Sequence, residues 1–227
     1  AALTSPIDIS DRDFRCPCYC EENVWRLAFR KLSKQQGSDS SEVFFVSFIS
    51  NVSKSVLMLC QKASSSPGRS VCWDYHVILI GVKNGSNGST ENVVVYDVDT
   101  TLTPYPLSLS AYIKASFPAF RQERFEPFFR LVPARTFLMY FSSDRSHMYD
   151  EKTGRWNAPP PLYKCIEPTE PFVVAPQEAA TTPDTTTKNT LKDYLNFDPS
   201  AAPETHISKE ALGVLLTLKQ LQAYHFR

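Results

Sequence analysis

The sequence has little glycine, no excess of either charge and no long apolar run. Seven of its 227 residues are glycine, and 24 lysines and arginines balance 24 aspartates and glutamates. The balanced charge gives no reason to expect nucleic acid or an anionic membrane as a partner. No apolar stretch reaches the roughly 20 residues that a membrane-spanning helix needs. The first residues show no charged-then-apolar signal pattern. We therefore expect a cytoplasmic protein, or one that is cytoplasmic and nuclear.

The composition is that of a folded protein with a hydrophobic core. Hydrophobic residues make up 42% of the chain and aromatic residues 12%, and the length suits one ordinary domain. A chain of this size does not need disulfide bonds for stability, and the run CPCYC crowds three cysteines together. We therefore expect reduced thiols at all six cysteines: Cys16, Cys18, Cys20, Cys60, Cys72 and Cys165.

The periodicity predicts a helix first, then a meander of strands, then more helices. An apolar stripe with helical spacing begins at Glu21 and stops at Gly37. Runs rich in β-branched and aromatic residues predict strands over 43–50, 55–60, 73–82, 93–98 and 128–132. Further helices are expected over 109–117 and 134–141. This order predicts an α+β fold with a mostly antiparallel sheet flanked by helices.

We expect one catalytic domain over 1–227, with an N-terminal arm over 1–15 that lies on the surface. Nine of the 17 prolines lie between Pro159 and Pro203, and a threonine-rich tract falls among them. Such a stretch cannot pack a core, so a flexible Pro/Thr-rich insertion is predicted at about 168–188.

Cys20 precedes the first predicted helix, which opens with Glu21 and Glu22. Backbone N–H groups and the helix dipole lower the pKa of a thiol at a helix N-terminus. The two glutamates oppose that effect. The position suits a cysteine nucleophile, although a cysteine at a helix start is also commonly a small buried hydrophobe.

His76 and Asp97 lie on two strands that we expect to form a hairpin. If His76 is directly opposite Asp97, the turn centres between Ser86 and Asn87, inside the turn-forming run NGSNG. Opposed residues bring their Cβ atoms to about 5 Å, which suits an imidazole–carboxylate hydrogen bond. The pair could be purely structural, but Cys20 is available as the third member of a catalytic triad.

Several short blocks of the chain, in the same order, are similar to one known family. These blocks are CYCEENVW, WDYHV, YDVDTTL, SSDRSHM and PPPLYKCI. They resemble the protein N-terminal glutamine amidohydrolases, the WDYHV-motif family. The resemblance covers roughly residues 16–167 and resumes near 191–199 and 213–226, so the predicted insertion lies outside it.

The resemblance implies a papain-like or transglutaminase-like fold with a Cys-His-Asp triad. Carried over residue by residue, Cys20 is the nucleophile, His76 the base and Asp97 the orienting acid. The implied activity converts an N-terminal glutamine to glutamate with release of ammonia, and the product enters the arginylation branch of the N-degron pathway. In this mechanism His76 holds Cys20 as a thiolate, a thioester forms, and backbone amides at the helix start stabilise the oxyanion. No cofactor or metal is expected.

Recognition of a chain terminus requires a group that binds the free α-amine, and a buried carboxylate is the natural partner. The tentative candidates are Asp74, on the predicted His76 face, Asp99, on the Asp97 face, and Glu22. Trp73 and Tyr75 are expected on the opposite strand face, in the core rather than against substrate.

Other interpretations remain open. Cys-x-Cys-x-Cys is not a usual zinc spacing, so a metal site there is not expected. The segment 143–148 could suggest a second hydrolytic centre, but it is interpreted as a polar loop that closes one side of the cleft. A related thiol peptidase or transglutaminase-like enzyme, or a non-catalytic module that binds N-termini, are the alternatives. The partners expected are proteins or peptides with a free N-terminal glutamine, and the protein is expected to be a monomer.

Overall fold

A central antiparallel sheet organises the computed structural model, which describes residues 10–35, 42–83, 92–169, 189–198 and 207–226. Its six strands run in the order β10-β7-β1-β4-β5-β6, and every pair is antiparallel. In chain order these strands are β1 (Val43–Ser50), β4 (His76–Val82), β5 (Val93–Tyr96), β6 (Leu107–Ser108), β7 (Phe128–Pro133) and β10 (Val214–Thr217). Two separate pairs join β2 (Val56–Met58) to β3 (Val71–Trp73) and β8 (Tyr149–Asp150) to β9 (Arg155–Trp156).

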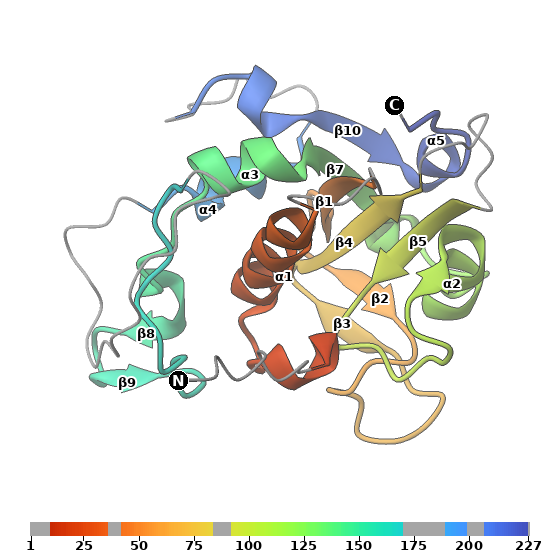
Figure 1. Cartoon of the computed structure of the whole chain (residues 1–227). Coiled ribbons are helices and arrows are strands. Elements are labelled where there is room, and N and C mark those ends of the chain that lie inside the picture. Colours follow the sequence, from red (N-terminus) through yellow and green to blue (C-terminus); the bar gives the residue numbers. More distant parts are fainter. Residues whose placement is uncertain (1–9, 36–41, 84–91, 170–188, 199–206, 227) are drawn as a thin grey trace.

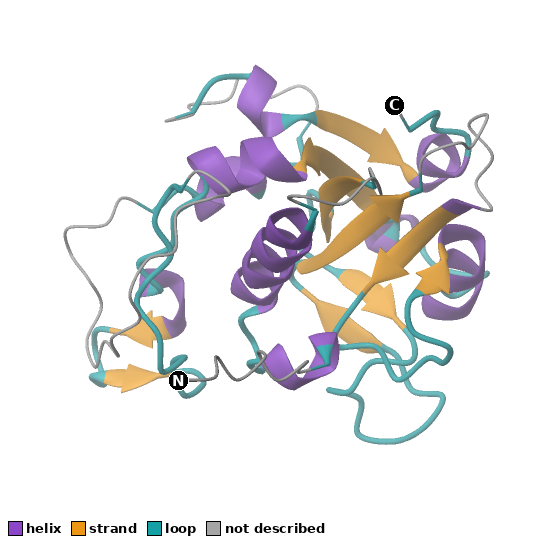
Figure 2. Ribbon diagram, viewed as in Figure 1, coloured by secondary structure: helices purple, strands orange, loops and turns teal. Residues whose placement is uncertain are grey.

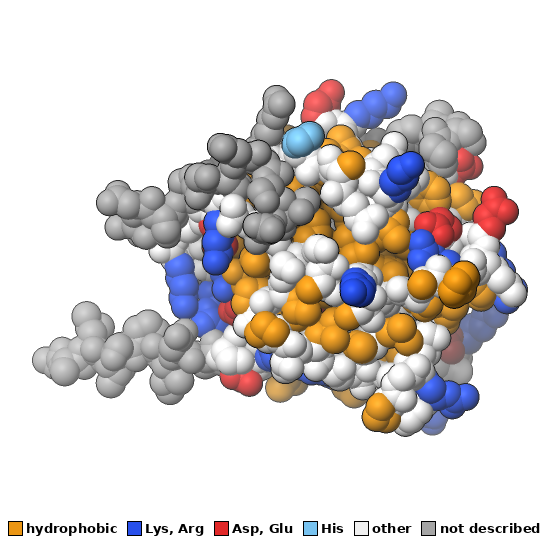
Figure 3. Space-filling view, turned by 90° about the vertical axis from the view of Figure 1, so that its right-hand side faces the viewer, with side chains coloured by type: hydrophobic (Ala, Val, Ile, Leu, Met, Phe, Trp, Pro, Cys, Tyr) orange, Lys and Arg blue, Asp and Glu red, His pale blue; other side chains and the backbone are white. Residues whose placement is uncertain are grey.

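Helices cover both faces of the sheet, and Figures 1 and 2 show the long helix α1 beside β4 and α2 beside β5. One apolar layer lies under α1 (Cys20–Lys34), α3 (Ala134–Tyr140) and α4 (Leu191–Tyr194). The other lies under α2 (Leu109–Ser116) and α5 (Leu218–Gln222). Figure 3 looks onto the side that carries these last two helices, where hydrophobic side chains gather among lysines and arginines. Among the described helices, none combines the length and the apolar character needed to cross a bilayer.

Alternate side chains of β4 point to opposite faces of the sheet, so this strand contributes to both apolar layers. All seven residues of β4 are buried, as expected for a central strand. Val77 and Leu79 pack in the α1 layer, whereas Ile78 and Ile80 pack in the α2 layer. The same period places His76 on the α2 side, at the end of the strand where the sheet meets the start of α1.

The predicted α+β class and antiparallel sheet are confirmed, and most predicted elements lie within a residue or two of the observed ones. The strand predicted over 73–82 is wrong at its start, because a bend at Asp74 and Tyr75 separates β3 from β4. The predicted helix stop at Gly37, the turn in the run NGSNG and residues 170–188 of the predicted insertion lie outside the described residues.

The hairpin register also differs from the prediction. Leu79 pairs with Tyr96 and Ile80 with Val95. In that register His76 would face position 99, two residues beyond Asp97. Because side chains on a strand alternate with a period of two, a shift of two residues keeps Asp97 on the His76 face. The predicted pair therefore forms diagonally rather than directly across the hairpin.

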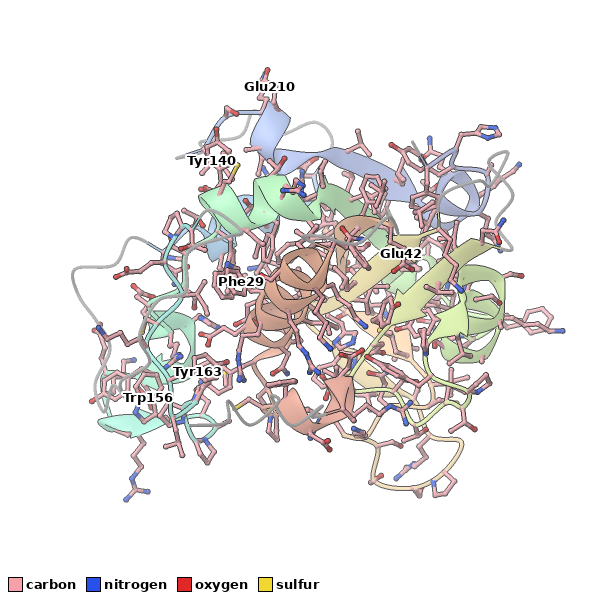
Figure 4. The ribbon with its side chains drawn as sticks, in the orientation of Figure 1. Phe29, Glu42, Tyr140, Trp156, Tyr163 and Glu210 are labelled. Carbon is pink, nitrogen blue, oxygen red and sulfur yellow. The ribbon has the colours of Figure 1, made fainter. Side chains whose placement is uncertain are left out.

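The small β8–β9 hairpin lies apart from the sheet. The chain segments before and after it are attached to the first turn of α1 by buried polar contacts. Arg145 donates to both carboxylate oxygens of Glu22, at 2.9 and 3.0 Å, and also to the carbonyls of Pro161 and Lys164. Figure 4 shows Tyr163 near α1, and its ring lies beneath the Arg145 guanidinium at 5.0 Å. One ion pair thus attaches two loops to the first turn of α1.

Loss of this ion pair is expected to destabilise the protein. Glu22 and Arg145 have side-chain exposures of 0% and 1%, so Glu22→Gln leaves a buried guanidinium without its counter-charge. We expect the free energy of unfolding to fall by about 3–5 kcal/mol. Urea unfolding measures the change. The double variant Glu22→Leu, Arg145→Met should recover part of the loss, and an unchanged stability in the single variant would contradict the role assigned to the pair.

Candidate active site

A buried imidazole–carboxylate pair lies where β4 begins and β5 ends. His76 Nε2 is 3.0 Å from Asp97 Oδ1, and each side chain is only 1% exposed. An ionised carboxylate only accepts hydrogen bonds, so Nε2 carries the proton. In the neutral ring, Nδ1 is then the basic nitrogen. Nδ1 is buried and has no hydrogen-bond partner among the described residues.

Three further donors hold the Asp97 carboxylate in place. Tyr112 Oη donates to Oδ2 at 2.8 Å, Gln61 Nε2 donates to Oδ2 at 3.2 Å, and the Asp99 amide donates to Oδ1 at 2.9 Å. Burial acts to raise the pKa of Asp97, but the His76 charge and these side-chain donors outweigh it and lower the pKa. Asp97 is therefore a fixed anion. Sequence reasoning missed Gln61 and Tyr112 because each is far from Asp97 in the chain and reaches it only through the tertiary fold.

The charge of Asp97 in turn favours the protonated form of His76. Burial alone would lower the pKa of His76, but the charge of Asp97 and its hydrogen bond raise it above 6.5. Trp73 stacks on the His76 ring, with centroids 5.4 Å apart and an interplanar angle of 17°. The pair is thus shielded from water and fixed in orientation, as a proton acceptor in a hydrolytic site needs to be.

Cys20 is the first residue of α1, and its thiol lies beside the strand that carries His76. The backbone N–H of Val77, the residue after His76, interacts with the thiol and lowers its pKa. Tyr19, the residue before the helix, makes no side-chain cap, so the first N–H groups of α1 have no side-chain acceptor from it. The thiol thus lies at the N-terminal end of α1 and against the residue that follows His76.

The resting state of that thiol differs from the expectation that His76 holds a thiolate. Although Cys20 as a residue is only half-buried, burial of the thiol raises its pKa well above 9.0, and the Glu21 and Asp99 carboxylates raise it further. Cys20 Sγ donates to Glu21 Oε2 at 3.6 Å. The thiol is therefore directed to Glu21, and His76 Nδ1 has no hydrogen-bond partner in the part of the chain that the structure describes.

Glu21 is a fully buried carboxylate that the sequence prediction did not select. Its side chain is 0% exposed. Oε2 accepts from Tyr75 Oη at 3.0 Å as well as from the thiol of Cys20. Oε1 has no hydrogen-bond partner among the described residues, although His147 Nε2 lies 3.4 Å away. The signal in the sequence that could have found Glu21 is its place next to Cys20.

The three predicted amine-binding carboxylates have different environments. Both oxygens of Glu22 bond Arg145. Asp99 is 3% exposed and pairs with Arg15 of the N-terminal arm at 2.5 Å. Asp74 is exposed and lies in the bend outside β4, where its Oδ1 accepts from the Tyr75 amide at 2.9 Å. The prediction that Asp74 shares a strand face with His76 is therefore wrong, because the strand starts only at His76.

The bend at Asp74 also changes the roles of the two neighbouring aromatics. Trp73 and Tyr75 pack against the apolar layers, as expected for core residues. Each of them nevertheless contacts a site residue, Trp73 through the His76 ring and Tyr75 through Glu21. On one straight strand both would have pointed away from His76. Trp73 therefore contacts the His76 ring, and Tyr75 contacts the first turn of α1.

The predicted loop over 143–148 contacts the site through His147. His147 Nε2 lies 3.4 Å from Glu21 Oε1 and 3.5 Å from Tyr75 Oη, and its side chain is 20% exposed. Arg145, with a positive φ of 62°, begins the short 3₁₀ turn that carries His147. The segment therefore contributes a titratable group at the solvent side of Glu21.

Ligand-type atoms of His76, Asp97 and Asp99 lie within 4.8 Å of one another, as a metal site would require. In this structure those atoms bond one another and Arg15.

All six cysteines are free thiols, as predicted. Cys16 anchors the loop before α1, because its backbone N–H and carbonyl both bond the Asn23 side chain at 2.8 Å.

Comparison with known proteins identifies one family. Residues 15–225 match the family model described as N-terminal glutamine amidase. The human protein N-terminal glutamine amidohydrolase is 34% identical over 189 residues, which cover 80% of this chain and 77% of that protein. The zebrafish (Danio rerio) protein of the same name is 39% identical over 188 residues, covering 80% and 78%. A relative with this name from Drosophila ananassae is 40% identical over 152 residues, covering 66% and 69%.

Proposed function

This chain belongs to the N-terminal glutamine amidase family, and from that premise we propose that it converts the N-terminal glutamine of proteins and peptides to glutamate. It is a hydrolase that acts on amide bonds. The observation that carries the proposal is the buried His76–Asp97 pair. His76 Nδ1 has no hydrogen-bond partner among the described residues, and the backbone N–H of the next residue, Val77, contacts the Cys20 thiol. A thiol, a base and an orienting acid are the groups that nucleophilic amide hydrolysis needs.

The proposed reaction proceeds through a thioester. Cys20 gives its proton to His76 Nδ1, and Sγ attacks the side-chain carboxamide carbon of the substrate. The tetrahedral oxyanion accepts hydrogen bonds from backbone N–H groups at the start of α1. The intermediate collapses as the imidazolium gives its proton to the departing nitrogen, which leaves as ammonia. Water, deprotonated by His76, then hydrolyses the thioester to glutamate and regenerates the thiol. Asp97 keeps the proton on Nε2 and stabilises the imidazolium at each stage.

The wider context is proposed on the same basis. A cysteine that opens a helix packed on an antiparallel sheet, with its base on the sheet, supports a papain-like or transglutaminase-like fold. We place the protein in the cytoplasm, or in the cytoplasm and nucleus, as a monomer. Its glutamate product would be a substrate for arginylation in the N-degron pathway.

Ammonia release from matched short peptides tests the proposal. One peptide begins with glutamine, one with asparagine, and one carries the same glutamine behind an acetylated N-terminus. We expect release from the free N-terminal glutamine alone. Peptide-bond cleavage would favour a thiol peptidase, and incorporation of an added amine would favour a transglutaminase. No turnover, together with binding of the free-terminus peptide by folded protein, would favour a non-catalytic module.

The acid limb of the pH profile is expected to lie above pH 6.5. His76 must be neutral to accept the thiol proton, and its pKa is raised above 6.5 by Asp97 against the opposing effect of burial. Activity should therefore be low below this pKa and rise as the pH passes through it. The pH dependence of kcat/KM measures the limb. A limb well below pH 6.5 would contradict the assignment of His76 as the base.

A further inference from the structure

We propose that Glu21 binds the α-ammonium of the substrate's first residue, and that this binding releases the Cys20 thiol from Glu21 so that it can bond His76. Glu21 would then be the residue that makes the enzyme specific for a chain terminus. The inference rests on the proposed function and names the residue that function still requires.

Glu21 differs from the other carboxylates near the site because one of its oxygens is buried and accepts no hydrogen bond from the described residues. Glu22 has both oxygens bonded by Arg145, and Asp99 is paired with Arg15. Asp74 is exposed to water, where a carboxylate gains little from binding an ammonium. Glu21 Oε1 is buried, and no described residue donates a hydrogen bond to it. A buried carboxylate oxygen that lacks a donor is costly, and an ammonium supplies the donor and the opposite charge together.

The position of Glu21 fits the length of a glutamine side chain. In glutamine, three C–C bonds and one C–N bond separate the carboxamide carbon from the α-nitrogen, a span of about 4–5 Å. The nucleophile is 3.6 Å from Glu21 Oε2. A reacting carbon about 3–3.5 Å from Sγ therefore leaves the α-nitrogen within reach of the same carboxylate. Asparagine has one methylene fewer, so it cannot satisfy both positions equally well.

Binding at Glu21 would also change the state of the nucleophile. Without substrate, the thiol donates to Glu21, and the Glu21 charge adds to burial in raising the pKa of Cys20. An ammonium on the carboxylate neutralises that charge and competes for the acceptor. The thiol is then free to donate to His76 Nδ1, to which no described residue is hydrogen-bonded. Recognition of the terminus and activation of the thiol become one event.

The groups that face Glu21 define how the site would respond to substrate. Tyr75 Oη holds Oε2 at 3.0 Å, and Cys20 and Glu22 flank Glu21 on α1. His147 Nε2 lies 3.4 Å from Oε1 on a partly exposed loop. The substrate ammonium would take the place of the His147 ring beside Oε1. This exchange requires only a movement of the His147 side chain, because the remaining contacts of Glu21 come from α1 and the bend before β4.

The test compares three isosteric variants, Glu21→Gln, Asp74→Asn and Asp99→Asn, on glutamine peptides with free and acetylated N-termini. We expect kcat/KM for the free peptide to fall about 10- to 100-fold in Glu21→Gln, because the counter-charge of the α-ammonium is lost. The advantage of the free over the acetylated peptide should therefore shrink by at least that factor in this variant. The preference should persist in Asp74→Asn and in Asp99→Asn, and also in a fourth variant, Glu21→Asp, which keeps the carboxylate.

A second readout separates this role from a structural one. Cys20 should be alkylated by iodoacetamide faster in Glu21→Gln than in wild type at neutral pH, because the opposing charge is gone. Mass spectrometry of the Cys20 peptide, with Cys72 as an internal reference, measures the rate. A variant with a more reactive thiol and a lower kcat/KM for the free peptide is the expected signature.

A third measurement keeps Glu21 intact, so it does not depend on the folding of any Glu21 variant. A peptide that begins with norleucine has a free amine but no carboxamide. It should lower the pKa at which the Cys20 thiolate appears in the ultraviolet difference spectrum between wild type and Cys20→Ser. The acetylated norleucine peptide should leave that pKa unchanged.

Two patterns of results would overturn the inference, and they differ from failure of the proposed function. If Glu21→Gln retains the preference for the free terminus, or if Asp74→Asn or Asp99→Asn loses it instead, Glu21 is not the amine-binding residue. An unchanged thiol pKa with the norleucine peptide would refute the coupling. If wild type hydrolyses the acetylated peptide equally well, or no peptide at all, the proposed function itself fails.

Discussion

Cys20→Ala is expected to reduce ammonia release from an N-terminal glutamine peptide by at least about 10⁴-fold, while the protein remains folded. The proposed mechanism forms its covalent bond through Sγ, and alanine has no atom in that position. Helix α1 tolerates the change, because alanine has the highest helix propensity and Cys20 is only half-buried. Circular dichroism and urea unfolding verify the fold, and coupled detection of ammonia measures the rate.

Cys72→Ala serves as the matched control for the loss of a thiol. Cys72 is exposed on β3 and contacts neither His76 nor Glu21 in any described hydrogen bond. Its replacement should leave the rate within a few-fold of wild type.

Hydroxylamine added during turnover should yield the substrate hydroxamate with wild type, because it intercepts the thioester. Ammonia release that persists in Cys20→Ala but disappears in Cys16→Ala would assign the nucleophile to the other cysteine.

The central fold could be predicted because its strands are apolar over their whole length. The observed β1 (Val43–Ser50) has the predicted bounds, and the helix predicted over 134–141 is α3, one residue shorter. The run that contains Asp74 was harder, because the whole of 73–82 has strand-like residues. Asp74 ends that pattern locally, since its side chain accepts from the next backbone amide and favours a bend. Side-chain capping of a bend does not appear in hydrophobic periodicity.

His76 and Asp97 form the predicted pair although the predicted hairpin register is wrong by two residues. The prediction rested on two facts, that an acid in a β-forming run needs a partner and that the turn lies between the two strands. An error of two residues moves a side chain along its face by about 7 Å but not through the sheet. The carboxylate and the imidazole are long enough to meet diagonally. An error of one residue would have separated them.

The groups around Cys20, His76 and Asp97 could not be predicted, because they come from segments far apart in the sequence. Arg15 reaches Asp99 from the N-terminal arm, and His147 reaches Glu21 from a loop more than a hundred residues later. Periodicity and turn chemistry describe neighbours within a few residues of one another. The ion pair between Arg145 and Glu22 has the same character, and it decides which glutamate of the pair has a free oxygen.

Asp97→Asn is expected to fold and to lower kcat by about 10²- to 10⁴-fold. An asparagine can retain the His76 hydrogen bond through its oxygen, with its amide nitrogen on the Gln61 and Tyr112 side. Gln61 can rotate its amide to accept there, since its Oε1 is buried without a partner among the described residues, and the Tyr112 hydroxyl can turn. The geometry is then preserved, but the anion that stabilises the His76 imidazolium is lost.

The pH profile of this variant separates the loss of charge from a loss of structure. Because the charge of Asp97 is what raises the pKa of His76 against the effect of burial, Asp97→Asn should move the acid limb of kcat/KM to lower pH. The control Tyr112→Phe removes one donor and keeps the carboxylate, so its limb should stay near the wild-type position with a loss of less than about 10-fold. If Asp97→Asn retains the wild-type rate and limb, Asp97 does not act on His76 in catalysis, and the buried pair would be structural.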